Sequence, residues 1–173
     1  MTPASELIAA AIDRWLGEVA APLVVAIDGH GAAGKTTIAG ELTLARDASL
    51  IHMDEYFQEM WDTGDPHPMS RYYAWHALRA EALEPTIRWL RETGGIGQGP
   101  PLVIVEGVSS ASPALADLID RAVFVQTPEE VRLERLHDRI SDEEWDEDWL
   151  AAERAYFAGR PPESFDLVVP GAS

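Results

Sequence analysis

Cysteine is absent from the 173 residues of this chain, and lysine occurs once, at position 35. The absence of cysteine excludes disulfides and thiol chemistry and suits a reducing compartment. No apolar run approaches the length of a membrane-spanning helix, and no basic region followed by an apolar stretch predicts a signal peptide. We therefore expect a cytoplasmic protein with no membrane partner.

Positive charge is scarce as well. The 13 Lys and Arg residues face 30 Asp and Glu residues, which gives a formal net charge of -17. A chain this acidic has no general basic surface for nucleic acid, so we expect no nucleic-acid partner. A small anion can still bind where backbone N–H groups and a few cations converge. The sequence leaves the oligomeric state open, a homo-oligomer included.

The most informative stretch is the apolar run of residues 23–28, which ends in a glycine-rich loop. The run is rich in β-branched residues and predicts a buried parallel strand. The loop has the spacing G-x-x-x-x-G-K-[ST] of a phosphate-binding loop (P-loop), and the spacing of Ile38, Leu42 and Ala45 predicts a helix after it. The predicted nucleotide-binding residues are Gly29, Gly31, Ala32, Ala33, Gly34, Lys35, Thr36 and Thr37.

Such a loop turns its N–H groups and the N-terminus of the next helix toward one anion. Lys35 would bridge the β and γ phosphates of ATP, and the Thr36 hydroxyl would hold Mg2+. ATP and Mg2+ are therefore the predicted cofactors. Asp28 is predicted to support the geometry of the loop and His30 to face solvent. The alternative is a tight strand-to-helix turn with an incidental lysine.

Strand-like and helix-like patterns alternate along the chain. Further strands are predicted at 49–53, 102–105, 122–125 and 167–169. Helices are predicted at about 3–16, from the P-loop to Arg46, from a cap at Ser70 to Leu83 with a break at Pro85, at 113–118, from Thr127, and up to Gly159. The alternation predicts an α/β protein with a three-layer P-loop NTPase fold and a parallel sheet of about five strands, in a single domain of residues 1–173.

Acidic residues follow the second and third predicted strands, where open α/β sheets bind ligands. Asp54 would accept the proton of an acceptor hydroxyl or act through water on Mg2+. Glu106 would hold Mg2+ indirectly or orient the acceptor. Turn or helix-cap roles are the alternatives for both. Glu55, on an extended segment, would point the other way, toward solvent.

Three arginines lie three and four residues apart, at Arg132, Arg135 and Arg139, and so share one face of a predicted helix. Such a face can close over ATP and neutralise charge that moves off the γ phosphate. We therefore place the arginine helix and a lid-like region within about residues 127–158. The alternative is a solvated helix whose arginines pair with neighbouring glutamates.

The acceptor pocket is predicted from polar and aromatic residues that follow the second strand. His67 and Arg71 could hold hydroxyls or a phosphate, and aromatic rings such as that of Tyr72 could stack on a base or sugar. Trp61 and Tyr73 lie in the same stretch. Packing or simple surface exposure is the alternative for each of them.

Four segments resemble the uridine kinase and phosphoribulokinase group of P-loop kinases. They are AIDGHGAAGKTT at 26–37, HMDEYF at 52–57, VIVEGV at 103–108, and RLER at 132–135 with Arg139. Their order and spacing match over nearly the whole chain. Residues 92–101 lack the insertion, with its Tyr-Asp-Phe and His/Arg pattern, that helps uridine kinases hold the nucleoside. Leu136 stands where a second arginine is usual in the group.

The resemblance implies a sheet of the nucleoside-monophosphate-kinase type with the P-loop strand at its centre. It implies that Asp54 is the catalytic base, that Lys35 binds phosphates and that Glu106 serves the metal or acceptor site. It also implies that Arg135 and Arg139 lie in a lid region over ATP.

These observations favour an ATP-dependent kinase for a small hydroxyl acceptor, with a uridine- or cytidine-like nucleoside as the first candidate. A sugar, a vitamin precursor such as pantothenate, or an antibiotic alcohol remains open. A nucleotide-binding regulatory module without transfer activity is the alternative from another class. A GTPase-type switch would need an Asn-Lys-x-Asp segment and a transporter ATPase a Ser-Gly-Gly-type signature, and the sequence has neither.

Overall fold

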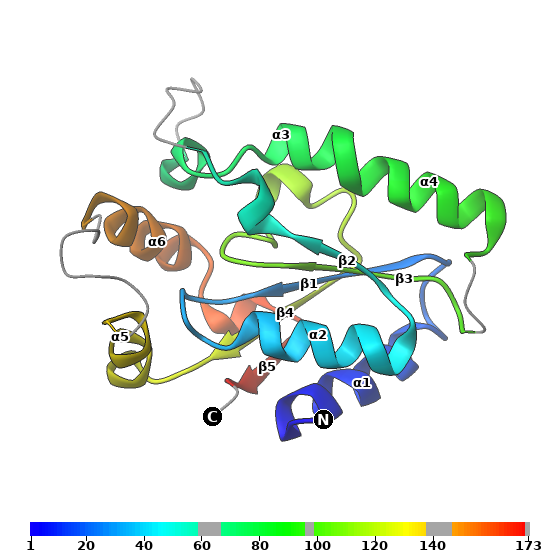
Figure 1. The fold of residues 1–173 in the computed structure, drawn as a ribbon, viewed down its shortest axis with the longest axis horizontal. Coiled ribbons are helices and arrows are strands. Elements are labelled where there is room, and N and C mark those ends of the chain that lie inside the picture. The colour runs from blue at the N-terminus through cyan, green and yellow to red at the C-terminus, as the bar shows by residue number, and fades with distance from the viewer. Residues whose placement is uncertain (59–66, 96–98, 138–146, 172–173) are drawn as a thin grey trace.

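The computed structural model describes residues 1–58, 67–95, 99–137 and 147–171. Its centre is one sheet of five parallel strands in the order β2-β3-β1-β4-β5 (Figure 1). The strands are β1 (Leu23–Asp28), β2 (Ser49–His52), β3 (Leu102–Glu106), β4 (Arg121–Gln126) and β5 (Leu167–Pro170). The five predicted strands are thus confirmed, and the P-loop strand β1 is central.

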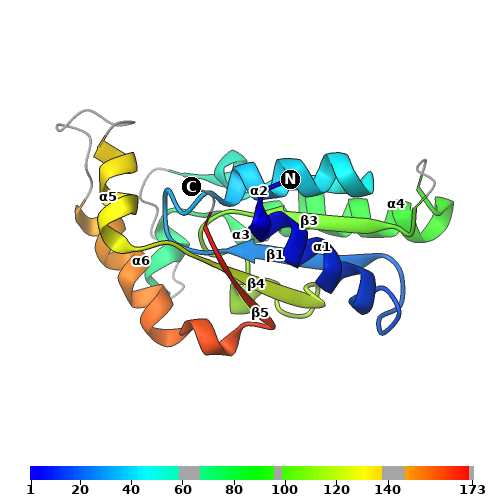
Figure 2. The ribbon, with the colours of Figure 1, turned by 90° about the horizontal axis from the view of Figure 1, so that it is seen from below.

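Helices cover both faces of this sheet. In the described part of the chain the α-helices are α1 (Pro3–Trp15), α2 (Lys35–Arg46), α3 (Trp75–Ala77), α4 (Glu84–Thr93), α5 (Glu129–His137) and α6 (Glu147–Gly159). Figure 1 and Figure 2 place α5 and α6 at the same end of the sheet. The predicted three-layer α/β architecture of a P-loop NTPase is confirmed.

The core divides into two clusters because successive residues of a strand point to opposite faces. Val25 and Ile27 of β1 pack in the cluster formed with α1 and α2. Val24 and Ala26 pack in the cluster formed with α3, α4 and α6. Every residue of β1 is therefore buried, which explains its unbroken apolar sequence.

The parallel register brings the ends of the strands to one edge of the sheet. Glu106, the last residue of β3, lies opposite Ile27 on one side and His52 on the other. The P-loop follows β1 at this edge, and Asp54 follows β2 by two residues. The edge therefore gathers the phosphate-binding loop and the acidic residues that the sequence singled out.

The prediction for residues 70–90 is wrong in two respects. Ser70 lies inside a short 3-10 turn (Pro68–Arg71), and the helix begins at Trp75 instead. The helix also continues through Pro85 without a break, because a π-helical segment (Leu78–Leu83) leads directly into α4. Proline has no N–H to donate within a helix. Because Pro85 lies in the first turn of α4, directly after the wider π turn, the helix does not need a hydrogen bond from this position.

Two shorter segments also differ from the prediction. The chain after β2 forms a 3-10 turn (Met53–Tyr56), so Asp54 and Glu55 do not alternate as on an extended strand. The helix expected at 113–118 is only a 3-10 turn (Pro113–Leu115), which the side chain of Ser112 caps. A single turn suffices there because Ser112 and Pro113 already set the N-terminal geometry.

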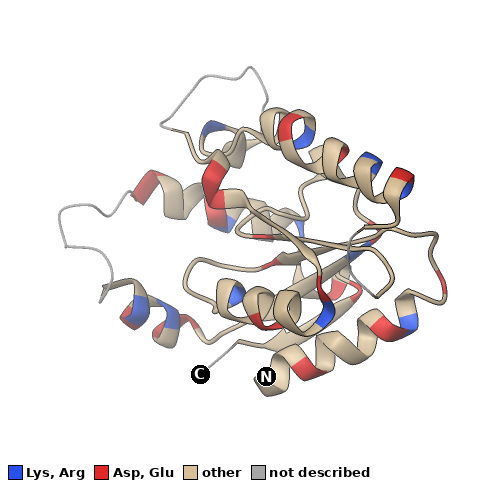
Figure 3. Ribbon diagram, turned by 45° about the vertical axis from the view of Figure 1, so that its right-hand side comes forward, with Lys and Arg blue, Asp and Glu red and all other residues tan. Residues whose placement is uncertain are grey.

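Charged residues are spread over the helices rather than gathered by sign. In Figure 3, Asp and Glu occur along most of the helices, with Lys and Arg scattered among them. None of the described helices combines the length and the apolar character that crossing a membrane requires.

Helix α2 offers a matched test of this packing. Leu42 is 0% exposed beneath α2, whereas Leu44, two residues later, is 90% exposed. We expect Leu42→Ala to lower the free energy of unfolding by about 2–5 kcal/mol, because it leaves a cavity in the core. Leu44→Ala is the control and should change it by less than about 0.5 kcal/mol. Urea denaturation measures both, and equal effects would contradict the described packing.

Candidate active site

The buried carboxylate of Asp28 fixes the start of the P-loop. It accepts N–H bonds from Gly29 (2.7 Å), Ser109 (2.9 Å) and Ala111 (3.0 Å), and an O–H bond from Tyr156 (2.6 Å). Burial raises the pKa of Asp28, and the bonds from Tyr156 and the backbone oppose that rise. The P-loop, the loop after β3 and α6 therefore meet on one side chain, in agreement with the predicted supporting role of Asp28.

The five carbonyl groups of residues 29–33 all accept hydrogen bonds from side chains. Lys35 Nζ donates to the first two, and single bonds to the carbonyls of residues 31, 32 and 33 come from Arg132, Arg135 and Thr127, in that order. The distances are 2.8 Å for both bonds of Lys35, 3.2 Å for Arg132, 3.3 Å for Arg135 and 3.0 Å for Thr127. These bonds fix the direction of each peptide group in the loop.

The N–H groups that follow are left for a ligand. Within the described residues, no acceptor bonds the backbone N–H of Gly34, Lys35, Thr36 or Thr37. Gly34 has a φ of 92°, a conformation that glycine adopts readily, and α2 begins directly after it. Free N–H groups at a helix N-terminus form an anion site. Burial lowers the pKa of the neighbouring Lys35 ammonium, against the pull of nearby carboxylates.

Glu106 is held beside the P-loop by two side chains. The Thr36 hydroxyl donates to its two carboxylate oxygens at 3.2 and 3.3 Å, and His52 Nδ1 lies 2.7 Å from Oε1. Glu106 is 3% exposed. A carboxylate in contact with the P-loop threonine is therefore fixed at the end of β3, where it can reach a ligand of that threonine.

Asp54 lies on the facing side of the same site. It accepts a hydrogen bond from the Tyr73 hydroxyl at 3.2 Å. Burial, together with the charge of Asp54, raises the pKa of Tyr73 well above its usual value, so the phenol keeps its proton and acts as the donor. Asp54 is otherwise solvent-exposed, and its second oxygen can meet an acceptor hydroxyl.

One cavity of about 450 Å³ joins these groups. It is lined by the P-loop with the start of α2 (31–37), by Asp54, Tyr73 and Glu106, and by Gly107, Val108, Leu136 and Trp149. The structure thus brings together Lys35, Thr36, Asp54 and Glu106, which the sequence had singled out separately. Arg135 does not line the cavity but contacts the P-loop from outside.

Of the residues predicted for the acceptor, Glu106 lines this cavity together with Tyr73, and three others do not. His67, Arg71 and Tyr72 are not among the residues that line this cavity. His67 Nδ1 accepts the Met69 N–H at 3.2 Å at the start of a 3-10 turn, Tyr72 is 3% exposed, and Arg71 is on the surface. Trp61 and Arg139 lie outside the described residues.

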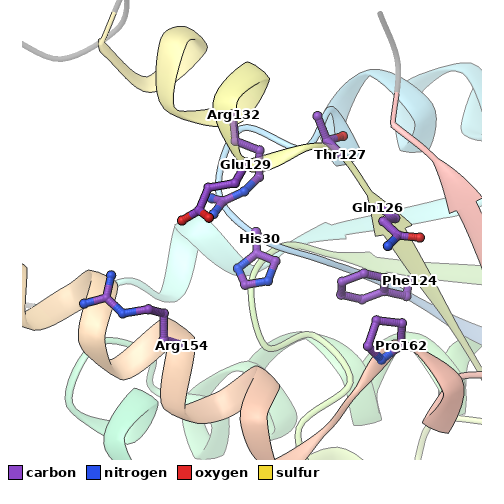
Figure 4. A pocket seen from close by; sticks show the side chains of 8 residues that line it. All are labelled: His30, Phe124, Gln126, Thr127, Glu129, Arg132, Arg154 and Pro162. Carbon is purple, nitrogen blue, oxygen red and sulfur yellow. The ribbon is translucent and has the colours of Figure 1, made fainter.

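His30 corrects another expectation, since its ring does not face solvent freely. Its Nδ1 lies 2.9 Å from Glu153 Oε2, and its ring lies 4.2 Å from the ring of Phe157. Figure 4 shows the His30 ring among Phe124, Pro162 and Arg132 in a second cavity of about 320 Å³. The ring is held there because α6 packs against the P-loop.

Sequence reasoning missed three residues of this region, His52, Glu153 and Tyr156. Two of them had a signal, because Trp149, Glu153 and Tyr156 recur at helical spacing and so share one face of α6. That face meets the P-loop. His52 had no signal beyond its place at the end of β2.

Oxygen ligands for a divalent cation are present in the main cavity. Mg2+ prefers oxygen and is bound in kinases by one or two side chains together with phosphate oxygens and water. Thr36 and Glu106 already touch each other, and Asp54 lines the same cavity. No cluster of three or more His, Cys, Asp or Glu side chains that could bind a metal occurs in the described part of the chain. The residues therefore fit a metal that is held partly by a nucleotide.

Comparison with curated proteins finds uridine-cytidine kinase A of Dictyostelium discoideum. It is 27% identical to this chain over an alignment of 143 residues, and the match covers 69% of this chain and 28% of that protein. The chain therefore corresponds to little more than a quarter of the length of its curated relative.

Solved structures with a similar fold include two proteins that were assigned as kinases. One is described as a possible uridine kinase from Bacillus stearothermophilus, with a TM-score of 0.63, 18% identity and coverage of 95% of this chain and 96% of that one. The other was provisionally assigned as a fructose transport system kinase from Silicibacter sp. TM1040, with a TM-score of 0.60, 20% identity and coverage of 98% and 100%. At these identities the likeness establishes the fold.

The family is shown by a match that covers most of the chain. A family model described as an AAA domain matches residues 25–153 and so spans β1, the P-loop, the ends of β2 and β3, and the arginine helix α5. The chain therefore belongs to the AAA domain family of P-loop proteins, and it resembles the uridine kinases.

Proposed function

We propose that this chain is an ATP-dependent kinase that transfers the γ phosphate to a hydroxyl group of a small molecule. The observation that carries the proposal is the cavity in which free P-loop N–H groups and Lys35 face the carboxylates of Asp54 and Glu106. A loop that binds phosphate would be present in any nucleotide-binding protein and does not by itself indicate a kinase. A carboxylate placed opposite it serves a second substrate that must lose a proton.

The transfer assigns a role to each side. The P-loop N–H groups and Lys35 bind the phosphates of ATP. Asp54 accepts the proton of the acceptor hydroxyl as its oxygen bonds to the γ phosphorus, and the bond from that phosphorus to the β–γ bridging oxygen breaks to release ADP. The resemblance assigns Arg135 and Arg139 to the charge that develops on the leaving group and the transferred phosphoryl, and Arg135 would have to leave the Ala32 carbonyl to reach it.

Magnesium fits the same cavity. Thr36, Glu106 and Asp54 would hold it there, Thr36 through its hydroxyl and the acids directly or through water. When bound, the cation would neutralise phosphate charge and shape the triphosphate for in-line attack. His52 supports this arrangement by its 2.7 Å contact with Glu106.

The acceptor is proposed to be a nucleoside similar to uridine or cytidine. The name of the curated relative supports this choice, and so do the flat side chains of Tyr73 and Trp149 in the cavity wall, which suit a ring. A sugar, a pantothenate-like vitamin precursor or an antibiotic alcohol is the alternative acceptor class. A regulatory module that binds nucleotide without transferring phosphate is the alternative function, and it would not need Asp54.

Lys35→Ala tests the anion site. We expect the variant to lose about 3–4 kcal/mol of transition-state stabilisation, because a preorganised cation in a water-poor site is removed. Steady-state kinetics of ADP release measure the change in kcat/KM. Circular dichroism should show an unchanged fold. Turnover equal to that of the wild type would contradict the assignment of the P-loop.

Asp54→Asn tests the proposed base. We expect phosphoryl transfer to fall by at least about 10²-fold, since the amide cannot accept the proton, while ATP affinity changes little. Glu55→Gln is the matched control, because Glu55 is an exposed acid beside Asp54 that does not line the cavity. If Asp54→Asn instead loses ATP affinity and keeps normal turnover at saturation, Asp54 is a metal or structural residue.

The acceptor is found by measuring ADP release from ATP and Mg2+ with a panel of nucleosides, sugars, vitamin precursors and antibiotic alcohols. Asp54→Asn serves as the blank. We expect one class to stimulate release strongly, with nucleosides first, because the side chains that line a pocket select its ligand by shape and by hydrogen bonding. Tight ATP binding with no stimulation by any acceptor would favour the regulatory alternative.

A further inference from the structure

Both backbone polar groups of Gly31 are held by side chains from outside the P-loop. Its N–H donates to Glu153 Oε1 of α6 at 2.6 Å, and its carbonyl accepts from Arg132 of α5 at 3.2 Å. The two side chains also meet each other, with Arg132 NH1 3.6 Å from Glu153 Oε2. Helices α5 and α6 therefore hold one residue of the loop through both of its adjoining peptide units.

Glu153 has a second contact with the loop, through His30. Its Oε2 lies 2.9 Å from His30 Nδ1, which carries the proton when the carboxylate is ionised. Burial favours the protonated acid, but hydrogen bonds from His30 and Gly31 and the charge of Arg132 outweigh it and lower the pKa of Glu153. Figure 4 shows the side chains of His30, from the P-loop, and Arg132, from α5, in the wall of the second cavity.

The packing at this point is close. A Cβ atom placed on Gly31 would lie 3.0 Å from the Trp149 ring and 3.4 Å from Glu153 Oε1. Trp149 stands one turn before Glu153 on α6 and lines the main cavity. The same face of α6 thus touches the outside of the loop and the space where phosphate would bind.

A buried anion beside a phosphate site is electrostatically unfavourable for a nucleotide. Glu153 is 1% exposed and ionised, and its side chain bonds the loop that must receive the phosphates. A neutral glutamine would fill the same volume without the repulsion. We therefore expect the Glu153 carboxylate to contribute an interaction that outweighs its repulsion of the phosphates.

We propose that Glu153 is a positioning residue, which holds the P-loop in its nucleotide-binding shape by tying Gly31 and His30 to α6. Arg132 completes the brace from α5 and compensates the charge. The inference rests on the nucleotide binding contained in the proposed function, but not on phosphoryl transfer or on the identity of the acceptor.

The sign of one measurement separates this role from simple electrostatics. Removal of a nearby negative charge by Glu153→Gln would tighten nucleotide binding if charge alone mattered. Loss of loop positioning would weaken it. We expect the dissociation constants of Mg2+–ADP and Mg2+–ATP to rise about tenfold or more, in line with the strength of hydrogen bonds to charged groups.

The experiment is isothermal titration calorimetry of the full chain with Mg2+–ADP, well below the melting temperature of each variant. Glu163→Gln is the control, because it removes an exposed glutamate that makes no contact with the P-loop, and it should leave the affinity unchanged. Glu153→Asp is the second variant. It keeps the charge but shortens the side chain, so it should also weaken binding.

Any of four results would overturn the proposal. A folded Glu153→Gln variant with tighter binding would show that only its charge matters. A lower melting temperature with unchanged affinity in both variants would show a merely structural role. A Glu153→Asp variant with wild-type affinity would show that reach to Gly31 is not required. A wild-type chain without nucleotide affinity would overturn this inference and the proposed function together, whereas binding without transfer would overturn only the latter.

Discussion

A fully buried carboxylate, that of Asp28, joins the parts of the molecule that form the site. Such a group is costly in an apolar interior unless every oxygen is hydrogen-bonded, so its donors must stay in place. They come from the P-loop, from the loop after β3 and from Tyr156 of α6. The shape of the phosphate site therefore depends on segments that lie more than a hundred residues apart, and α6 is part of that site although it carries no recognised motif.

The architecture could be predicted from the sequence because buried parallel strands leave long apolar runs, such as that of β1. The segment around Pro85 could not. Whether a proline breaks a helix depends on the hydrogen bonds of the preceding turn. Here that turn is π-helical, and the residue types of Leu78–Leu83 do not predict a π-helix. The 3-10 turn after β2 escaped prediction for a similar reason, since its bonds are local and its residues suit a strand equally well.

The candidate site likewise contains residues that could be predicted from the sequence and residues that could not. Lys35, Thr36, Asp54 and Glu106 could be predicted because each lies in the P-loop or close to the end of a strand, and the topology of the sheet brings these ends together. The residues after β2 that line the cavity could not be predicted, because their spacing in the sequence does not show which way they pack. His67 and Tyr72 are not among the lining residues: His67 packs against Tyr156, and Tyr72 is buried. Glu153 meets His30 across 123 residues, a contact that only the folded chain reveals.

Because the chain has a single lysine, the phosphate site carries a reactive amine that no other side chain provides. Lys35 is the only side-chain amine of the chain, it is 7% exposed, and burial lowers its pKa. Arginine supplies every other fixed positive side chain, and its guanidinium stays protonated and unreactive at neutral pH. Apart from the α-amino group, a reagent that acylates amines therefore has one target, Lys35. Its modification removes the cation of the phosphate site and leaves the remaining surface chemically unaltered.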